Sequence, residues 1–328
     1  MSDLAPLAES VAVDPLVSHP PDYHVFHEFL ERCKKLPAIT TAVCWPLSDV
    51  ALRGTVEAAD EGLIKPTLIG DKAGIKALAA KIGLDISQYP IVDADTEVKA
   101  AELSVAMCRT GNAQALMKGS LHTDVLMKVG MVRDTGLRTT RRISHVFVVD
   151  TPAYARTLLI TDAAINIEPE LIDKIHIVQN AIDLAHALGI PEPKVALLSA
   201  VETVSTKIKS TLDAAALCKM ADRGQITGGI LDGPLAFDTA VSITAAKIKG
   251  LVSPVAGQAD ILVVPDLESG NMLAKQLEYL GGAQMAGIVI GARVPTILTS
   301  RADSAETRLT SCAVAVLLHY AEHPLGKA

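Results

Sequence analysis

Residues 295–304 read P-T-I-L-T-S-R-A-D-S. The short apolar run 296–299 predicts a buried strand, and Asp303 with Ser304 can cap a following helix. Ser300 and Arg301 would then lie at the carboxyl end of a strand, beside a helix N-terminus. Ligands bind at this edge of open α/β sheets, and backbone N–H groups with a guanidinium suit a phosphate. The alternative is a surface arginine on an ordinary turn.

Strands and helices alternate through the rest of the sequence. Its 328 residues suffice for two domains or one large one. The pattern predicts an α/β fold with a mostly parallel sheet and helices on both faces. The predicted strands include 40–45, 66–70, 115–117, 144–150, 158–161, 194–199, 228–235, 259–265 and 286–291.

Polar residues recur just after the predicted strands. If these strands are all parallel, their tips lie along one edge of the sheet, where a ligand would bind. Serine and aspartate at strand ends can instead be helix caps, whereas Lys118 and Arg301 cannot be N-caps. The recurring residues are Lys118, Asp162, Ser199, Asp232, Asp266 and Ser300.

The segment after the strand at 115–117 is also rich in polar groups. Lys118, Gly119 and Ser120 follow the strand directly, and His122 with Thr123 falls in the expected first turn of a helix. A lone histidine is more often structural, so a substrate contact by His122 is one of two interpretations. A basic run comes next, and His145 opens a strand, where we interpret it as structural. The basic run consists of Lys128, Arg133, Arg138, Arg141 and Arg142.

Composition excludes several classes of function. A net charge of −7 and 3% aromatic residues argue against nucleic-acid binding. No apolar run approaches the roughly 18 residues of a spanning helix, and no signal peptide is evident, so we expect no membrane association. Five scattered cysteines indicate reduced thiols in a cytoplasmic protein. P-loop, dinucleotide-binding, nucleophile-elbow and zinc-protease motifs are missing.

Several pieces, taken in their order and spacing, resemble the phosphate acetyltransferase and phosphate butyryltransferase family, in its short single-module form. The resemblance covers residues 40–320. The pieces are M-K-G-S-L-H-T-D (117–124), S-H-V-F-V-V-D (144–150), L-L-I-T-D-A-A-I-N-I (158–167), K-V-A-L-L-S (194–199), I-L-D-G-P-L-A-F-D-T-A (230–240), A-D-I-L-V-V-P-D-L-E-S-G-N-M-L-A-K (259–275) and T-S-R-A-D-S (299–304).

The resemblance implies transfer of an acetyl or other short acyl group between acyl phosphate and coenzyme A. It implies a homodimer, coenzyme A as co-substrate, no permanently bound cofactor and no catalytic metal. The implied fold is a two-domain α/β structure with an interdomain cleft, like isocitrate and isopropylmalate dehydrogenases. Residues 1–150 with 291–328 would form one domain, and 151–290 the other.

The resemblance also implies site residues. The family's Ser-Arg pair matches Ser300 and Arg301, and its G-N-x-x-x-K piece matches Gly270, Asn271 and Lys275 as coenzyme A contacts. Residues Lys118, Gly119, Ser120, His122 and Thr123 would complete the binding surface.

At two positions the sequence differs from the acetyltransferase branch of the family, and both differences favour the butyryltransferase branch. Where that branch has an aspartate thought to be the base, this chain has Thr307, with Glu306 beside it. Where that branch has an arginine after its Gly-Ala-x-His segment, the nearest equivalents here are Leu126, Met127 and Lys128. The general base and the preferred acyl chain therefore stay open.

A mechanism follows for the transfer. Arg301 and Lys118 would hold phosphate, and Ser300 or a backbone N–H would stabilise the oxyanion. A carboxylate, Glu306 or Asp303, would deprotonate the coenzyme A thiol. Direct attack in a ternary complex needs no protein nucleophile.

Two other classes remain open. One is a metal- and NAD-dependent dehydrogenase of related fold, with Asp162, Asp232 and Asp266 as metal ligands. The other is a non-catalytic subunit that binds coenzyme A or phosphate.

Overall fold

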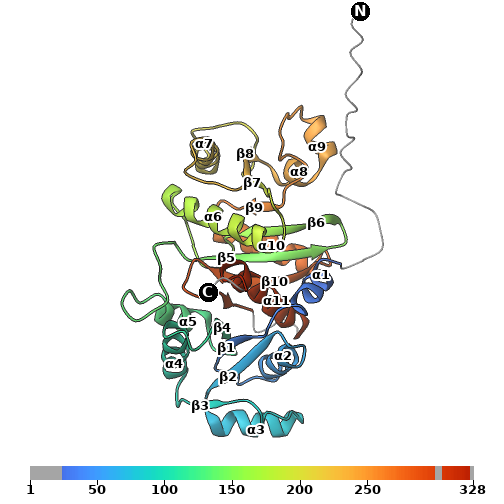
Figure 1. The fold of residues 1–328 in the computed structure, drawn as a ribbon. Helices are drawn as coiled ribbons and strands as arrows, with labels where there is room; N and C mark the ends of the chain where they lie inside the picture. Colours follow the sequence, from blue (N-terminus) through green and yellow to red (C-terminus); the bar gives the residue numbers. More distant parts are fainter. Residues whose placement is uncertain (1–23, 300–304, 326–328) are drawn as a thin grey trace, which may run out of the picture.

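The computed structural model describes residues 24–299 and 305–325. One sheet runs through the protein in the order β3-β2-β1-β4-β11-β10-β5-β6-β9-β7-β8 (Figure 1). Its strands are β1 (Ile39–Cys44), β2 (Ile64–Gly70), β3 (Ile91–Asp93), β4 (Ala115–Lys118), β5 (Ser144–Thr151), β6 (Tyr154–Thr161), β7 (Lys194–Leu198), β8 (Ile230–Leu235), β9 (Ile261–Val263), β10 (Gln284–Ile290) and β11 (Thr296–Ile297).

Helices cover both faces of this sheet, as the alternating pattern predicts. In Figure 1, α2 and the pair α4–α5 lie on opposite sides of the first strands. The helices are α1 (Val25–Cys33), α2 (Asp49–Asp60), α3 (Lys72–Ile82), α4 (Glu97–Arg109), α5 (Thr123–Gly130), α6 (Leu171–Ala187), α7 (Lys209–Asp222), α8 (Phe237–Val241), α9 (Ile243–Ile248), α10 (Leu267–Tyr279) and α11 (Ala305–Glu322).

Local sequence signals set the ends of these helices. The Ser48 side chain accepts from the N–H of Ala51 and caps α2, and Asp71 caps α3 in the same way. Gly83 ends α3 with φ of 70°, a left-handed conformation that glycine adopts without steric cost. Residues 237–248 form two helices, α8 and α9, because Ser242 is extended and its Oγ caps the second.

The sheet is mostly parallel, as predicted, but its strands do not all point the same way. Strands β1, β2, β3, β4 and β11 are parallel. Strands β10, β5 and β6 then pair antiparallel in turn, so β6 and its parallel neighbours β9, β7 and β8 run opposite to β4. The register nevertheless places Met117, Ile297, Ile288, Val146 and Thr161 in one row, so Lys118 and Asp162 each lie one residue beyond this row, in opposite directions.

The core has two layers. On one face, α1, α2, α6 and α11 pack against alternate residues of the central strands, including Val146, Val148 and Ile288. On the opposite face, α4 and α5 pack on β1 and β4, and α8, α9 and α10 pack on β5, β6 and β9. Because one sheet runs through both predicted domains, the domain boundaries stay a prediction.

Across the described ranges, we find no helix long and apolar enough to cross a membrane.

Candidate active site

Lys118 occupies the end of β4 and is almost fully buried, with 2% of its surface exposed. Its Nζ donates to the carbonyl oxygens of Thr299, at 3.3 Å, and Gly119, at 3.5 Å. Thr299 directly precedes Ser300 and Arg301 in the sequence. The structure thus places a buried ammonium group where the predicted Ser-Arg segment begins.

Three of the predicted catalytic residues fall on a segment that the structure does not describe. Ser300, Arg301 and Asp303 lie outside the described residues. Their roles in binding phosphate, stabilising an oxyanion or removing a proton therefore stay predictions.

A tight turn holds Gly119 and Ser120 against the end of β1. Both the N–H and the Oγ of Ser120 donate to the carbonyl oxygen of Trp45, at 2.9 and 3.0 Å. Trp45 has φ of 58°, a region that costs a non-glycine residue about 1–3 kcal/mol and often marks functional sites. The sequence analysis did not identify Trp45 as a candidate site residue. Its position at the end of the predicted strand 40–45 was the one feature that could have indicated such a role.

Replacing Gly119 with alanine should disrupt this turn. An added Cβ would overlap the Trp45 carbonyl and lie 2.5 Å from the Cys44 carbonyl oxygen, and neither backbone can easily move. We expect a loss of roughly 1–3 kcal/mol in the free energy of unfolding, together with lower activity, measured by urea unfolding and steady-state assay. Gly130→Ala is the control, because its added Cβ meets nothing within 4 Å. Equal stability of the two variants would contradict the expectation.

His122 and Thr123 lie at the start of α5, as predicted. His122 occupies the N-cap position but its side chain does not cap the helix, and it is exposed. Its ring is therefore available to a ligand. Asp124 and Lys128 form an exposed ion pair at 3.3 Å on the same helix. Whether His122 and Thr123 contact substrate remains a prediction.

Glu306 lies in the first turn of α11 and is exposed. Its Oε1 accepts a hydrogen bond of 3.1 Å from Nε2 of Gln284, the first residue of β10. Glu306 is thus anchored at the edge where β4 and β11 end. Its role as general base stays a prediction.

Asn271 and Lys275 lie one turn apart on α10. Asn271 donates through Nδ2 to the carbonyl of Ala163, at 3.2 Å. Lys275 forms an ion pair of 2.7 Å with Glu278, and its ammonium lies 5.6 Å from the centre of the Tyr279 ring. Asn271 therefore ties α10 to the turn after β6, and the coenzyme A contacts of both residues stay predictions.

The three aspartates proposed as metal ligands each have a local hydrogen-bonding role. Asp162 is buried, and its carboxylate accepts from the N–H groups of Ala164 and Ile165, both at 3.0 Å. Burial raises the pKa of Asp162, and these hydrogen bonds oppose the shift. Asp266 caps α10, and Asp232 accepts from the N–H of Gly233.

The structure therefore offers no support for a set of metal ligands. Over residues 24–299 and 305–325, no three His, Cys, Asp or Glu side chains come together to hold a metal ion.

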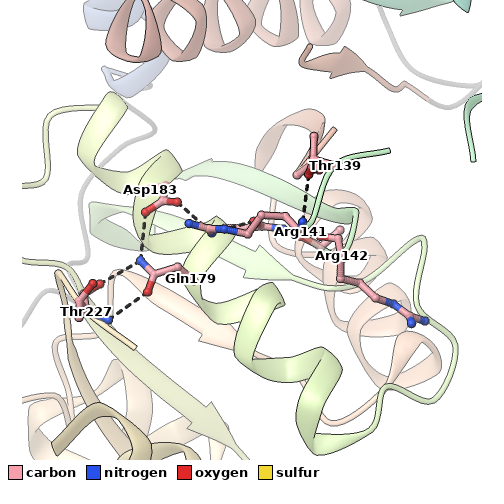
Figure 2. Close-up of polar contacts among 9 residues, drawn as sticks. Thr139, Arg141, Arg142, Gln179, Asp183 and Thr227 are labelled. Atoms are coloured by element: carbon pink, nitrogen blue, oxygen red, sulfur yellow. Dashed lines mark hydrogen bonds and ion pairs between the residues drawn. The ribbon is translucent and has the colours of Figure 1, made fainter. Parts of the chain in front are cut away.

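Two arginines of the basic run join the segment after α5 to α6, and Figure 2 shows the first of these links, between Arg141 and Asp183. Arg141 pairs with Asp183 at 3.0 Å, and Arg142 pairs with Asp173 at 2.9 Å. Arg142 also donates to Asn166 at 2.7 Å, next to the Asp162 turn. These arginines hold two parts of the fold together, a role that the sequence alone did not reveal.

His145 is fully buried near the start of β5, and among residues 24–299 and 305–325 neither of its ring nitrogens has a hydrogen-bond partner. Burial lowers its pKa to about 3, although the nearby carbonyl of Leu298 favours the protonated form. The ring meets that of Phe147 edge-on, with centroids 4.4 Å apart. The sequence predicted a structural role for His145 but did not reveal that its ring lies beside the backbone of Leu298, two residues before Ser300.

None of the cysteines is suited to act as a nucleophile. All five are free, and burial raises the pKa of every thiol to about 12. A thiol with such a pKa is almost entirely protonated at neutral pH and therefore unreactive.

The fold and the buried lysine define an α/β protein with a candidate anion site at the carboxyl ends of β4 and β11. The family described as Phosphate acetyl/butaryl transferase matches residues 97–316. A phosphate acetyltransferase of Rhizobium meliloti is 60% identical over 281 residues, which cover 86% of this chain and 89% of that protein. The chain belongs to the phosphate acetyl/butaryl transferase family.

Other relatives act on longer acyl groups, according to their names. A phosphate butyryltransferase of Clostridium beijerinckii is 42% identical to this chain, and the matched residues cover 89% of this chain and 97% of that protein. The crystal structure of a branched-chain phosphotransacylase from Enterococcus faecalis superposes with a TM-score of 0.76 at 33% identity, covering 86% of this chain and 99% of that one. The predicted family is thereby confirmed, and the enzyme is a phosphate acyltransferase.

Proposed function

We propose that this phosphate acyltransferase moves an acetyl group between acetyl phosphate and coenzyme A by direct thiolate attack in a ternary complex. The observation that carries the proposal is the buried ammonium of Lys118 on the carbonyl of Thr299, the residue before Ser300. A cation there can neutralise the phosphate leaving group, while the segment that follows supplies the Ser-Arg pair.

The remaining roles complete the mechanism. Arg301 binds the phosphate with Lys118, and Ser300 or a backbone N–H stabilises the oxyanion. Glu306 or Asp303 removes the thiol proton, and Asn271 with Lys275 binds coenzyme A. The five protonated thiols fit a reaction without a protein nucleophile.

The preference for acetyl rests on similarity. The chain is 60% identical to the acetyltransferase and 42% identical to the butyryltransferase described above. A single methylene changes kcat/KM by only about 10- to 200-fold in an apolar pocket, so activity on butyryl phosphate is the runner-up.

The proposal also covers the oligomeric state, the cellular location and the domain structure of the enzyme. We expect a homodimer, since the second half of the chain exposes large apolar side chains such as Ile248, Val252 and Leu280. We also expect a cytoplasmic protein whose two domains resemble those of isocitrate and isopropylmalate dehydrogenases. Light scattering on the purified protein tests the dimer.

The test is coenzyme A-dependent phosphate release from acetyl and butyryl phosphate, measured side by side with EDTA present. We expect turnover of both with a higher kcat/KM for acetyl phosphate. A higher value for butyryl phosphate would reverse the assignment of the acyl chain. Absence of turnover until a divalent metal and NAD are supplied with a hydroxy acid would overturn the proposal.

Arg301→Ala should raise the KM for acetyl phosphate and lower kcat, because the phosphate loses a bidentate cationic partner. The expected loss in kcat/KM is about 10²–10³-fold, measured by steady-state kinetics. Arg133→Ala is a control from the basic run. Unchanged turnover and unchanged KM in Arg301→Ala would remove this residue from the mechanism.

A further inference from the structure

Trp45 directly follows β1, beside the strand that ends in Lys118. Cys44, the last residue of β1, is paired with Lys118 of β4, so the two chains leave the sheet next to each other. Trp45 adopts φ of 58°, which is a genuine outlier for a residue with a bulky side chain. The backbone beside the candidate phosphate-binding lysine is therefore strained.

This conformation of Trp45 directs three hydrogen-bond donors to one carbonyl oxygen. The N–H and the Oγ of Ser120 donate to the Trp45 carbonyl at 2.9 and 3.0 Å, and the N–H of Leu47 donates to it at 2.9 Å. The bond from Leu47 closes a three-residue turn around Pro46. Ser120 is thereby held through both its main chain and its side chain.

Close packing on two sides holds Trp45 in this conformation. A Cβ at residue 70 would lie 3.2 Å from Cε3 of Trp45 and 3.5 Å from its Cα, and a Cβ at residue 119 would overlap the Trp45 carbonyl. Glycine at both positions lets the ends of β2 and β4 approach Trp45. The Trp45 ring packs against the apolar cluster that contains Ile69 and Leu121. The surroundings therefore maintain a conformation that is costly by itself.

The turn that Trp45 fixes also orients an acceptor of the Lys118 ammonium group. The carbonyl of Gly119 and the N–H of Ser120 belong to one planar peptide, so they point in opposite directions. This N–H donates to Trp45, and this carbonyl accepts from Nζ of Lys118 at 3.5 Å. The N–H of Gly119 is bound in turn to the Cys44 carbonyl at 2.8 Å. A change in the direction of the Trp45 carbonyl would therefore rotate the peptide that contacts the ammonium.

We propose that Trp45 is a positioning residue for Lys118, and that it acts through its positive φ rather than through its ring. The inference rests on the proposed function, in which Lys118 binds phosphate. A residue that does not adopt a positive φ turns its carbonyl away from Ser120, which releases the Gly119 peptide and lets the ammonium move. A misplacement of about 1 Å can lower the rate of a reaction about 10²-fold.

The test compares Trp45→Gly with Trp45→Val, because both substitutions remove the ring. Glycine adopts positive φ freely, whereas valine, which is branched at Cβ, does so only under strain. We expect Trp45→Val to lower kcat/KM for acetyl phosphate by about 10- to 100-fold and to weaken inhibition by inorganic phosphate, while the KM for coenzyme A changes little. Trp45→Gly should keep most of the kcat/KM and the phosphate inhibition of the wild type.

Phe237→Val is the matched control, because it replaces an exposed aromatic residue on α8 by valine, and it should behave as wild type. If Trp45→Val does not fold, Trp45→Gly decides, since loss of its phosphate inhibition would contradict a role of the backbone alone.

Two further results would overturn the inference while the wild-type enzyme is active. One is an equal loss in Trp45→Gly and Trp45→Val, which would assign the effect to the ring. The other is unchanged phosphate inhibition in a folded Trp45→Val. Absence of acyl transfer in the wild-type protein would overturn the proposed function, and this inference with it.

Discussion

Lys118→Met should lower kcat/KM for acetyl phosphate by about 10²–10³-fold, the usual loss when a preorganised charged donor is removed from a transition state. Methionine keeps the length and apolar stem of lysine but cannot neutralise phosphate. The ammonium lies in a site with 2% exposure, so water cannot readily replace it. Inhibition by inorganic phosphate should weaken in parallel, while the KM for coenzyme A changes little.

Lys118 also donates to the carbonyls of Thr299 and Gly119, so its loss removes structural hydrogen bonds as well. Lys118→Arg separates the two effects, because it retains the positive charge and should recover part of the phosphate affinity. Lys128→Met serves as the control for an exposed lysine in the same region. If phosphate inhibits Lys118→Met as strongly as the wild-type enzyme, Lys118 does not bind phosphate.

The sequence was informative where local signals decide the structure. Alternating apolar runs predicted the sheet, and Ser48 and Asp71, residue types that favour helix N-caps, cap α2 and α3. Asp266, which was also considered as a site residue, is the N-cap of α10. Asp266 therefore follows its strand as a helix cap, which was one of the two interpretations of such polar residues. Lys118 cannot be an N-cap, and it is buried at the end of β4.

The mostly parallel sheet was predicted correctly, but the antiparallel pairing of β5 and β6 was missed. These strands are joined by a tight turn without a helix, and they pair as an antiparallel hairpin. Parallel strands require a crossover of a dozen or more residues, so the short interval between 150 and 158 already excluded a parallel pair. The hairpin reverses the direction of β6, β7, β8 and β9, while the register keeps the end of β6 level with the end of β4.

Other features depend on contacts between residues far apart in the sequence. The pairs Arg141–Asp183 and Arg142–Asp173 join segments about 30–40 residues apart. Nothing in the local sequence distinguishes these arginines from phosphate-binding ones. The positive φ of Trp45 arises similarly, because the turn at Gly119 and Ser120 requires the Trp45 carbonyl as an acceptor.

Buried His145 should make the protein sensitive to acid. Burial lowers its pKa in the folded protein to about 3, from the ordinary value of 6.5. The unfolded chain therefore binds more protons than the folded one between these two pH values, so stability falls as the pH drops below about 6.5. From pH 7 to pH 4, this one group should cost about 3 kcal/mol of unfolding free energy.

His145→Leu should abolish this contribution. The substitution removes two buried ring nitrogens that have no hydrogen-bond partner in the described part of the chain, and leucine can pack beside Phe147. We therefore expect urea unfolding to give similar stability at pH 7 and a variant more stable than wild type by about 3 kcal/mol at pH 4. Comparing the two proteins at each pH cancels the titration of the carboxylates that both contain. His27→Gln, at an exposed histidine, should follow the wild-type curve. If His145→Leu and wild type lose stability in parallel between pH 7 and pH 4, His145 is protonated in the folded protein and its burial does not govern the acid response.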